Sequence, residues 1–248
     1  MQSRDEYPIK AVSTTFEILE SLHRSGPMDL TELADRCDLS KPGVFKHLKT
    51  LRLLGYVHKQ DNVYDLTHRF LGVSLDRRSR EPLYTVATSV ADRLTSANEC
   101  VTSLVFREGT DVVFLHQSAR DEDETTPVRE GEYRTLAKSV GGLAILEAFE
   151  RAEGPDAPAV EGEHELEMAT PDINIMNGRV VSFDRDQLYD GWHTVATSIK
   201  DTGDEPIAAI ETSYTADEAS AFDLEINMAG QLTKAADTIE ERLHARQD

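Results

Sequence analysis

The spacing of apolar residues near the start of the chain predicts an amphipathic helix. Four of them recur every three or four positions and would share one buried stripe: Val12, Phe16, Leu19 and Leu22. This helix would either be capped by Ser13 or begin one turn earlier, and Gly26-Pro27 would end it.

Two further helices are predicted, with a tight turn between them. Asp29 would cap the first, with Glu32 three residues later as in a capping box. Ser40 would cap the second, and Pro42 fits its first turn, where a missing N–H costs little. The buried stripes are expected at Leu30, Leu33 and Ala34 in the first helix, and at Val44, Leu48, Leu51 and Leu54 in the second. Helix, tight turn and helix is the pattern of a helix-turn-helix.

A β-hairpin is predicted directly after the third helix. Residues 56–59 and 63–66 alternate between apolar and polar side chains, and Gln60-Asp61-Asn62 between them is rich in turn-forming residues. A helix-turn-helix followed by such a hairpin is a winged helix, whose wing lies beside DNA.

The rest of the chain has the mixed pattern of an α+β domain. Residues 67–82 are expected to be a helical or irregular linker. Helices are expected at 83–94 and 139–151 and from about Asp217. Strands are expected at 101–106, 112–116, 191–199 and 206–214, and irregular charged segments at 118–126 and 153–171. We therefore predict a winged helix-turn-helix domain at 1–66, a linker at 67–82 and a mixed domain at 83–248. The apolar faces at 83–94 and 232–243 would be either core or a dimer contact.

Charge adds a candidate DNA-binding surface. The chain has 26 Lys and Arg against 46 Asp and Glu, a net charge of −20, yet residues 40–60 contain five basic residues and no acid. Lys and Arg supply the phosphate contacts that give most non-specific DNA affinity. The candidate DNA-binding residues are Ser40, Lys41, Gly43, Phe45, Lys46, Lys49, Thr50, Arg52 and Lys59. Gly43 leaves the backbone open for close approach, and Phe45 would either pack on a neighbour or touch a thymine methyl group.

The acidity is concentrated after residue 80. Residues 1–80 have 13 basic and 11 acidic side chains, so residues 81–248 have 13 and 35, a net charge of −22. A soluble acidic protein is one interpretation, and adaptation to concentrated salt, as in a halophilic archaeon, is the other. Because the acids are scattered and not gathered in a tail, we favour salt adaptation.

The sequence gives little support for a membrane protein, a secreted protein or an enzyme. It contains no apolar run long enough to span a membrane, no signal-peptide pattern and only two cysteines, so we expect a cytoplasmic protein. The eight histidines have no metal-ligand spacing, and no nucleotide-binding or nucleophile motif is present. We expect neither enzymatic activity nor a cofactor.

Three segments resemble the isocitrate lyase regulator (IclR) family of transcription regulators. They are LTELADRCDLSKPGVFKHLKTLRLLGYV in the head, and EYRTLAKSVGGLAILEAF and DRDQLYDGWHTVATSIKDTGDEPIAAIETS in the body. The resemblance covers most of the chain. It implies an N-terminal winged helix, a C-terminal domain related to GAF folds, a homodimer or a dimer of dimers, and a small-metabolite effector.

The resemblance also implies an effector pocket in the body. By position, its lining residues would be Ser139, Gly141, Gly142, Asp184, Thr194, Ala196 and Ser213, although packing in the core is an equal alternative for each. The chain departs from the family's usual pocket residues: Ala137 and Leu143 replace a His and a Lys, and Thr194 and Ser198 replace a Cys and a Pro.

These observations favour a DNA-binding transcription regulator whose affinity for a double-stranded operator is modulated by a small metabolite. Two alternatives remain open. One is a small-molecule-binding or catalytic domain whose N-terminal domain mediates assembly, and the other is an architectural DNA-binding protein without a ligand.

Overall fold

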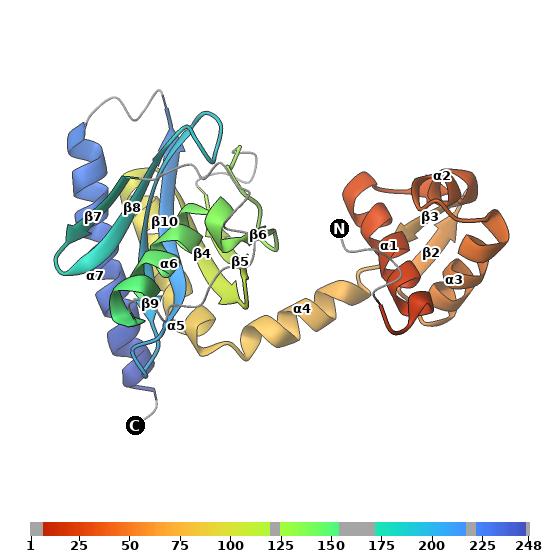
Figure 1. Cartoon of the computed structure of the whole chain (residues 1–248), viewed down its shortest axis with the longest axis horizontal. Coiled ribbons are helices and arrows are strands. Elements are labelled where there is room, and N and C mark those ends of the chain that lie inside the picture. The colour runs from red at the N-terminus through yellow and green to blue at the C-terminus, as the bar shows by residue number, and fades with distance from the viewer. Residues whose placement is uncertain (1–6, 120–124, 154–171, 217–221, 247–248) are drawn as a thin grey trace. The chain divides into compact units, whose positions relative to one another are not determined.

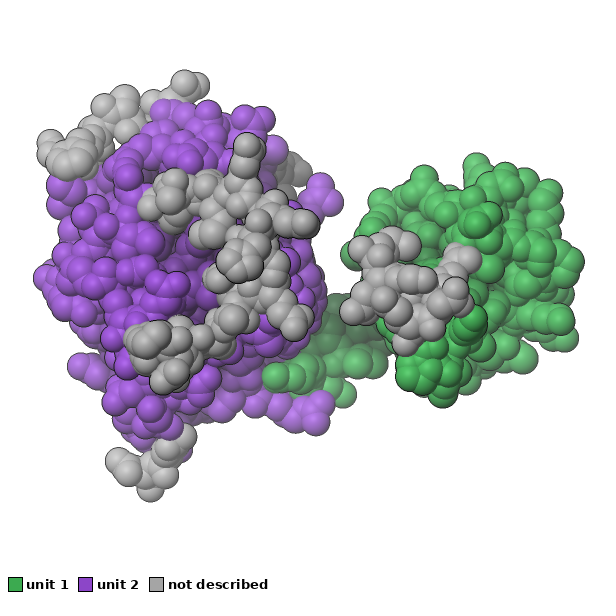
Figure 2. All heavy atoms as spheres, in the orientation of Figure 1, with its two compact units in different colours: residues 1–77 green, residues 78–248 purple. Residues whose placement is uncertain are grey.

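The computed structural model describes residues 7–119, 125–153, 172–216 and 222–246 (Figure 1). The chain divides into two compact units, Met1–Arg77 and Arg78–Asp248, which Figure 2 shows in different colours. Their boundary falls inside the segment expected to be a linker. Most of that segment is a helix, α4 (Arg69–Ser79), none of whose residues is buried.

Between residues 7 and 66, unit 1 consists of three helices and a small antiparallel sheet. Its strand order is β1-β3-β2, and the hairpin pairs Gln60 with Val63 around a two-residue turn. Asp61 and Asn62 have φ of 46° and 74°, as this tight, twisted turn requires. The elements are α1 (Lys10–Ser25), β1 (Met28–Asp29), α2 (Leu30–Arg36), α3 (Lys41–Leu53), β2 (Val57–Gln60) and β3 (Val63–Leu66). The predicted helix-turn-helix and hairpin are confirmed, and only the two-residue β1 was not expected.

The capping residues predicted for α2 and α3 have the expected contacts. The Asp29 carboxylate accepts hydrogen bonds from the backbone N–H groups of Thr31 (2.6 Å) and Glu32 (2.9 Å), and the Glu32 carboxylate accepts one from the Asp29 N–H (2.9 Å). Ser40 Oγ accepts a hydrogen bond from the Gly43 N–H at 3.3 Å. Ser13 does not cap α1: that helix begins after Ile9 without a side-chain cap.

The stripe predicted for α1 was wrong in its first half. Leu19 and Leu22 are buried together with Ile18, but Val12 is 50% exposed and Phe16 58%. The inward position in this half of the helix belongs to Thr15, whose Oγ1 forms a hydrogen bond of 2.8 Å with Nδ1 of His47 on α3. With Thr15 on the same inward side as Ile18 and Leu22, Val12 and Phe16 lie on the outward side of the helix.

The stripe predicted for α3 was wrong only at its end. Val44, Leu48 and Leu51 are buried in the core of unit 1, but Leu54 is 56% exposed. Because α3 ends at Leu53 and Gly55 follows with φ of 80°, Leu54 lies beyond the last helical turn and leaves the stripe.

Unit 2 is a seven-stranded antiparallel sheet covered by helices on both faces. The strand order is β6-β5-β4-β10-β9-β8-β7, and strands β6, β7 and β8 were not predicted. The α+β class is confirmed. The strands are β4 (Val101–Glu108), β5 (Asp111–Ser118), β6 (Tyr133–Thr135), β7 (Asp172–Met176), β8 (Arg179–Arg185), β9 (Trp192–Lys200) and β10 (Pro206–Thr215); the helices are α5 (Pro82–Asn98), a short 3-10 helix (Leu136–Lys138), α6 (Val140–Glu153) and α7 (Phe222–His244).

Helices α5 and α7 share one face of this sheet, and α6 covers the other (Figure 1). The sequence left open whether the apolar faces of α5 and α7 belong to the core or to a dimer contact. Their residues lie in the core of unit 2, where all of these are buried: Leu83, Val86, Val90, Leu94, Leu232, Ala236, Ile239 and Leu243. Asn98 and Gln231 exchange two hydrogen bonds of 2.9 Å between the two helices. Most of 118–126 and 153–171, and the expected helix start at Asp217, lie outside the described residues. None of the helices described is both long and apolar enough to cross a membrane.

Candidate DNA interface and effector site

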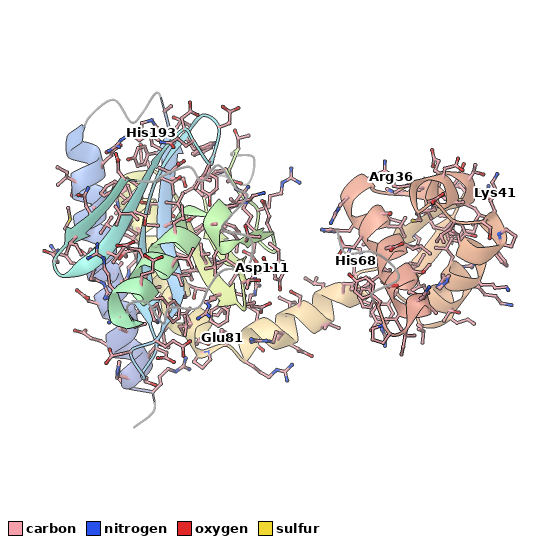
Figure 3. The ribbon with its side chains drawn as sticks, viewed as in Figure 1. Arg36, Lys41, His68, Glu81, Asp111 and His193 are labelled. Atoms are coloured by element: carbon pink, nitrogen blue, oxygen red, sulfur yellow. The ribbon has the colours of Figure 1, made fainter. Side chains whose placement is uncertain are left out.

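Helix α3 presents the basic residues of unit 1 to solvent. Its apolar stripe faces the core, and this leaves the opposite face free for polar side chains. Lys41 marks the start of the helix on the surface of the unit (Figure 3). Every candidate DNA-binding side chain is exposed: Ser40, Lys41, Phe45, Lys46, Lys49, Thr50, Arg52 and Lys59.

Gly43 lies close to the side chain that caps α3. A Cβ atom at this position would lie 3.1 Å from Ser40 Oγ, the oxygen that caps the helix. This contact is close but involves a side-chain oxygen that can shift, and a role of Gly43 in close approach to DNA stays a prediction. Phe45 is 47% exposed, so packing within unit 1 leaves about half of the ring uncovered.

A basic hollow lies between α3 and strand β2 of the wing. Its volume is about 460 Å³, and its lining residues are Lys49, Arg52, Leu53, Val57, His58 and Lys59. The Lys59 ammonium lies 5.1 Å from the centroid of the Tyr64 ring, which holds this long side chain against the hairpin. Lys49 and Arg52 from α3 and Lys59 from the wing thus line a single concave surface. Lys and Arg are the residue types that bind phosphate.

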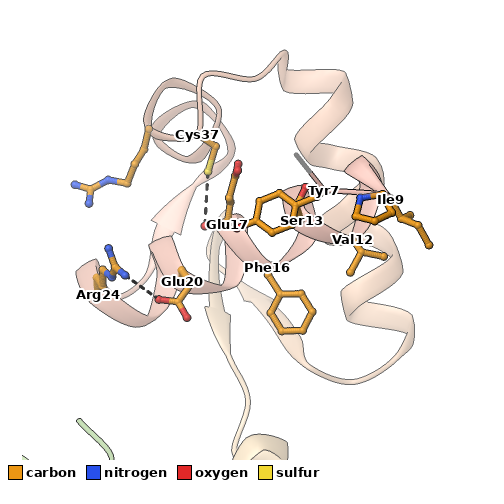
Figure 4. A pocket seen from close by; sticks show the side chains of 11 residues that line it. Tyr7, Ile9, Val12, Ser13, Phe16, Glu17, Glu20, Arg24 and Cys37 are labelled. Atoms are coloured by element: carbon orange, nitrogen blue, oxygen red, sulfur yellow. Dashed lines mark hydrogen bonds and ion pairs between the residues drawn. The ribbon is translucent and has the colours of Figure 1, made fainter. Parts of the chain in front are cut away.

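A second hollow of unit 1 lies over the outward half of α1 (Figure 4). Its volume is about 520 Å³, and Ile9, Val12 and Phe16 supply much of its lining. At its edge, Arg24 and Glu20 form an ion pair of 3.3 Å. Three exposed apolar side chains grouped on one helix are unusual for a surface without a partner.

The α6 face of the sheet in unit 2 contains a cluster of buried polar side chains. Cross-strand pairing aligns Asp184, Thr194 and Ser213 in one row, and Ser182, Ala196, Glu211 and Ser103 in the next. All seven are at most 2% exposed. We call the six polar members of these rows the polar floor: Ser103, Ser182, Asp184, Thr194, Glu211 and Ser213. Interior faces of sheets are normally apolar, so this concentration of hydroxyl and carboxyl groups is a candidate binding site.

The first turn of α6 lies directly over the polar floor. The Gly141 N–H donates to Oε2 of Glu211 at 2.9 Å, and the Gly142 N–H donates to Ser139 Oγ at 3.0 Å. A Cβ at Gly142 would lie 2.2 Å from the Leu136 carbonyl oxygen, and one at Gly141 would lie 3.0 Å from Val105. Glycine is therefore required at position 142, where the helix packs against the backbone of the preceding turn. It is favoured at position 141, where the helix packs against the sheet.

Three of the candidate effector residues on the sheet have hydrogen-bond partners within the chain, and a fourth packs in the core. The Asp184 carboxylate accepts hydrogen bonds from the Leu188 N–H (3.1 Å) and the Gln187 N–H (3.4 Å), so it fixes the turn between β8 and β9. Burial raises the pKa of Asp184, and these backbone donors oppose that shift. Thr194 Oγ1 and Ser213 Oγ form a hydrogen bond of 2.8 Å with each other. Ala196 packs in the apolar core under α6.

The sequence analysis missed Glu211, Tyr189 and Ser182. Tyr189 donates to Oε1 of Glu211 at 3.5 Å and accepts from the Val140 N–H at 3.4 Å. Burial raises the pKa of Glu211 to about 7, although the Gly141 N–H, Arg134 and Tyr189 act in the opposite direction. The sequence did contain a signal for Glu211, because this carboxylate lies inside the apolar run PIAAIETSY. Alternation along a strand places it on the same face as Ala209, which is expected to be buried.

A metal centre finds no support in the part of the chain that the structure describes. No group of three or more His, Cys, Asp or Glu side chains there is arranged to hold an ion.

Comparison with known proteins identifies the head most directly. Residues 11–61 match the model of the IclR helix-turn-helix domain. A curated relative, the p-hydroxybenzoate hydroxylase transcriptional activator of Acinetobacter baylyi, is 31% identical over 91 residues. This match covers 37% of the chain and about a third (34%) of the relative's length.

Solved structures match nearly the whole chain in fold. A putative transcriptional regulator from Rhodococcus sp. RHA1 is 19% identical with a TM-score of 0.75, and the match covers 96% of this chain and 99% of that one. An IclR homologue from Microbacterium hydrocarbonoxydans, solved with 4-hydroxybenzoate, is 18% identical with a TM-score of 0.69 over 95% and 99% of the chains. Thermotoga maritima IclR also has a TM-score of 0.69 at 18% identity, over 94% and 98%. Residues 11–61 are therefore similar to the IclR helix-turn-helix domain, and the chain shares the fold of solved IclR-type structures.

Proposed function

We propose that this protein is a transcription regulator that binds a double-stranded DNA operator through unit 1 and a small metabolite through unit 2. The observation that carries the proposal is the basic, acid-free surface of α3 in a chain of net charge −20, within a domain that matches the IclR helix-turn-helix. A regulator needs no catalytic group, so we expect no enzymatic activity. We place the protein in the cytoplasm.

In this proposal α3 enters the major groove and the hairpin lies beside the backbone. Lys41, Lys46 and Thr50 would face base edges or nearby phosphates, because they lie on the exposed side of the helix. The hollow lined by Lys49, Arg52 and Lys59 would receive a phosphate of the backbone. Phosphate contacts would fix the register, and the outward side chains of α3 would read the sequence.

The effector would bind between the polar floor and the first turn of α6. Support comes from the buried hydroxyl and carboxyl groups gathered there, and from the similar fold of the Microbacterium protein that was solved with 4-hydroxybenzoate. Ser139, Gly141 and Gly142 would contact it from the helix side. Asp184, Thr194, Ala196 and Ser213 would contact it from the sheet. Binding would shift the population of operator-competent conformations.

We further propose a homodimer formed through the outward half of α1. The faces of α5 and α7 are buried within unit 2, whereas Ile9, Val12 and Phe16 stay uncovered in unit 1. A two-fold contact there would place two copies of α3 on one operator, and one winged helix alone buries little DNA surface.

The net charge of −22 in residues 81–248 supports a further proposal, that the protein works in concentrated salt, as in a halophilic archaeon. Since salt weakens phosphate contacts, the reading of base edges by α3 would then carry more of the affinity.

A double charge reversal tests DNA binding. Lys46→Glu with Lys49→Glu should weaken binding to a genomic operator about 100-fold or more, because two attractive contacts become repulsive. The matched control, Lys138→Glu with Lys234→Glu, makes the same charge change on exposed lysines of unit 2 and should keep wild-type affinity. Fluorescence anisotropy at fixed KCl measures both. Equal losses in the two variants would mean that only net charge matters, and no loss in the first would favour an assembly role for unit 1.

A further inference from the structure

Glu211 is an unexpected residue at the centre of the polar floor. Its side chain is fully buried and lies beneath a helix of 14 residues, α6. Both carboxylate oxygens have partners: Oε2 accepts from the Gly141 N–H at 2.9 Å, and Oε1 accepts from the Tyr189 hydroxyl at 3.5 Å. The chain therefore supplies its own carboxylate to the first turn of α6.

This contact uses the part of α6 that would otherwise attract an anion. The first N–H groups of a helix have no partner within the helix, and the helix dipole adds positive potential there. A helix N-terminus with free N–H groups normally binds a carboxylate from a ligand. Here, the Gly141 N–H already has a carboxyl oxygen of the chain as its partner, and Ser139 Oγ accepts from the Gly142 N–H.

Above the pKa of Glu211, about 7, an incoming anion would also meet repulsion from the floor. Asp184 lies on the same face as Glu211, and its negative charge contributes to raising the pKa of Glu211. The nearby guanidinium of Arg134 lies 4.8 Å from the centroid of the Tyr189 ring, and its Nε donates to Glu132 at 2.6 Å. That cation is thus already paired with a carboxylate. Like charges brought together in a buried site repel strongly because the effective dielectric constant is low.

The floor instead offers hydrogen-bond acceptors. Among the described residues, buried Ser182 Oγ has no hydrogen-bond partner, and Ser182 lies in the same cross-strand row as Ala196 and Glu211. A buried hydroxyl without a partner costs free energy unless something binds it. The hydroxyls of Thr194 and Ser213 lie in the neighbouring row. Together with the two carboxylates, these groups favour a ligand that brings O–H or N–H donors.

We propose that Glu211 occupies the anion site of α6 from within the chain, so that the effector site excludes carboxylates and takes a neutral or cationic ligand rich in hydrogen-bond donors. Polyols and amines share this chemistry. The proposal rests on the proposed effector site and adds the class of its ligand.

The decisive experiment uses acetate as the probe on the full-length protein. Glu211→Ser removes the internal carboxylate and frees the Gly141 N–H, so acetate should bind at least tenfold more tightly to this variant than to wild type. Thermal unfolding is followed with acetate replacing chloride at constant ionic strength, because a ligand of the folded state raises the midpoint. Glu211→Gln keeps the side chain's size and its acceptor oxygen but removes the charge, so it should fold like wild type and gain less acetate affinity than Glu211→Ser. Glu241→Gln, an exposed position on α7, is the matched control and should gain none.

Acetate stabilisation of wild type equal to that of Glu211→Ser would overturn the proposal, and so would the absence of any gain in Glu211→Ser. If Glu211→Ser does not fold, Glu211→Gln decides by a second readout. Wild type and Glu211→Gln are compared for binding of 4-hydroxybenzoate and the uncharged 4-hydroxybenzamide by calorimetry. Wild type should disfavour the carboxylate relative to the amide, and Glu211→Gln should reduce that discrimination at least tenfold. Equal discrimination in both proteins, or none in wild type, would contradict exclusion by the Glu211 charge.

A last comparison, on wild type, distinguishes a polyol ligand from an amine ligand. Glucose is compared with gluconate, and tyramine with 4-hydroxybenzoate, by the same calorimetry. Preference for the first member of either pair supports the proposal and names the source, whereas preference for the acid in either pair overturns it. None of these measurements contains DNA, so failure of operator binding leaves their outcome unchanged.

Discussion

At the scale of single residues, Glu211 couples the stability of unit 2 to pH. Burial raises its pKa to about 7 in the folded protein, against an ordinary value of 4.5. Protonated Glu211 is therefore favoured by folding. Its stabilising contribution is complete below pH 4.5 and is lost as pH rises through about 7. The shift corresponds to a change on the order of 3 kcal/mol in the free energy of unfolding.

Glu211→Gln should remove this dependence, because the amide does not titrate. The free energy of unfolding of wild type, relative to Glu211→Gln, should fall by on the order of 3 kcal/mol between pH 5 and pH 8. Urea denaturation at several pH values measures the difference, and Glu241→Gln controls for the loss of an exposed carboxyl group. A constant difference between wild type and Glu211→Gln would show that Glu211 keeps one ionisation state over this range.

The sequence predicted exposed residues better than buried polar ones. Lys46 and Lys49 could be placed on the solvent side of their helix because charged groups off an apolar stripe face water. Glu211 is one of 46 acidic residues, and although it lies in an apolar run, the sequence does not show which groups it contacts. Its role depends on Gly141 and Tyr189, which lie 70 and 22 positions away in the chain. Similarly, the bond between the inward-facing Thr15 and His47 joins residues 32 positions apart.

At the scale of elements, the capping box of α2 should contribute measurably to the stability of unit 1. Asp29→Ala removes the acceptor of two backbone N–H groups at the start of a helix of only seven residues. We expect a loss of about 1 kcal/mol in the free energy of unfolding of this unit, which is typical for an N-cap. Chemical denaturation followed by DNA binding reports on unit 1. Asp35→Ala, exposed on the same helix, is the control. Equal losses in both variants would assign the effect to charge and not to the cap.

The elements that were predicted have local signals, and those that were missed depend on distant partners. Caps, Pro42 and Gly55 delimit α2 and α3 within a few residues, so their bounds could be predicted. Strand β6 has only three residues, and β7 alternates between polar and apolar residues over only four positions, so neither gives a strong signal in the sequence. Strand β8 is buried over five successive residues, a pattern that does not distinguish a strand from a helix. Pairing with β5, β8 and β9 defines these strands.

At the scale of the whole molecule, the negative charge should make stability depend on salt. Repulsion among carboxylates destabilises the compact state when screening is weak. The Debye length falls from about 10 Å at 0.1 M to about 3 Å at 1 M salt. We expect the thermal midpoint to rise by at least about 4 °C over this range of KCl, which corresponds to about 1–2 kcal/mol for a chain of this size. Sucrose at matched osmolality is the control for solvent exclusion. A flat or falling midpoint in KCl would contradict adaptation to salt.

The proposed dimer makes a further prediction about the operator. A two-fold protein requires a pseudo-palindrome whose half-site centres are about 10–10.5 bp apart, or a multiple of that spacing. Inserting about 5 bp should place the second half-site on the wrong face of the duplex and weaken binding strongly. Inserting a full turn should weaken it less if the segment at 67–82 can adjust. Gel shifts on these spacer variants measure the effect.

Phe16→Glu links this spacing rule to α1. The charge would lie within the apolar hollow of Figure 4, so the variant should be monomeric by light scattering, bind the operator much more weakly and lose its sensitivity to spacing. Ile175→Glu is the matched control, because Ile175 is 54% exposed, close to the 58% of Phe16, but lies on β7 of unit 2. It should stay dimeric and keep the spacing rule. A dimeric Phe16→Glu protein would move the contact away from α1, and tight binding by a monomer to every spacer would exclude a symmetric complex altogether.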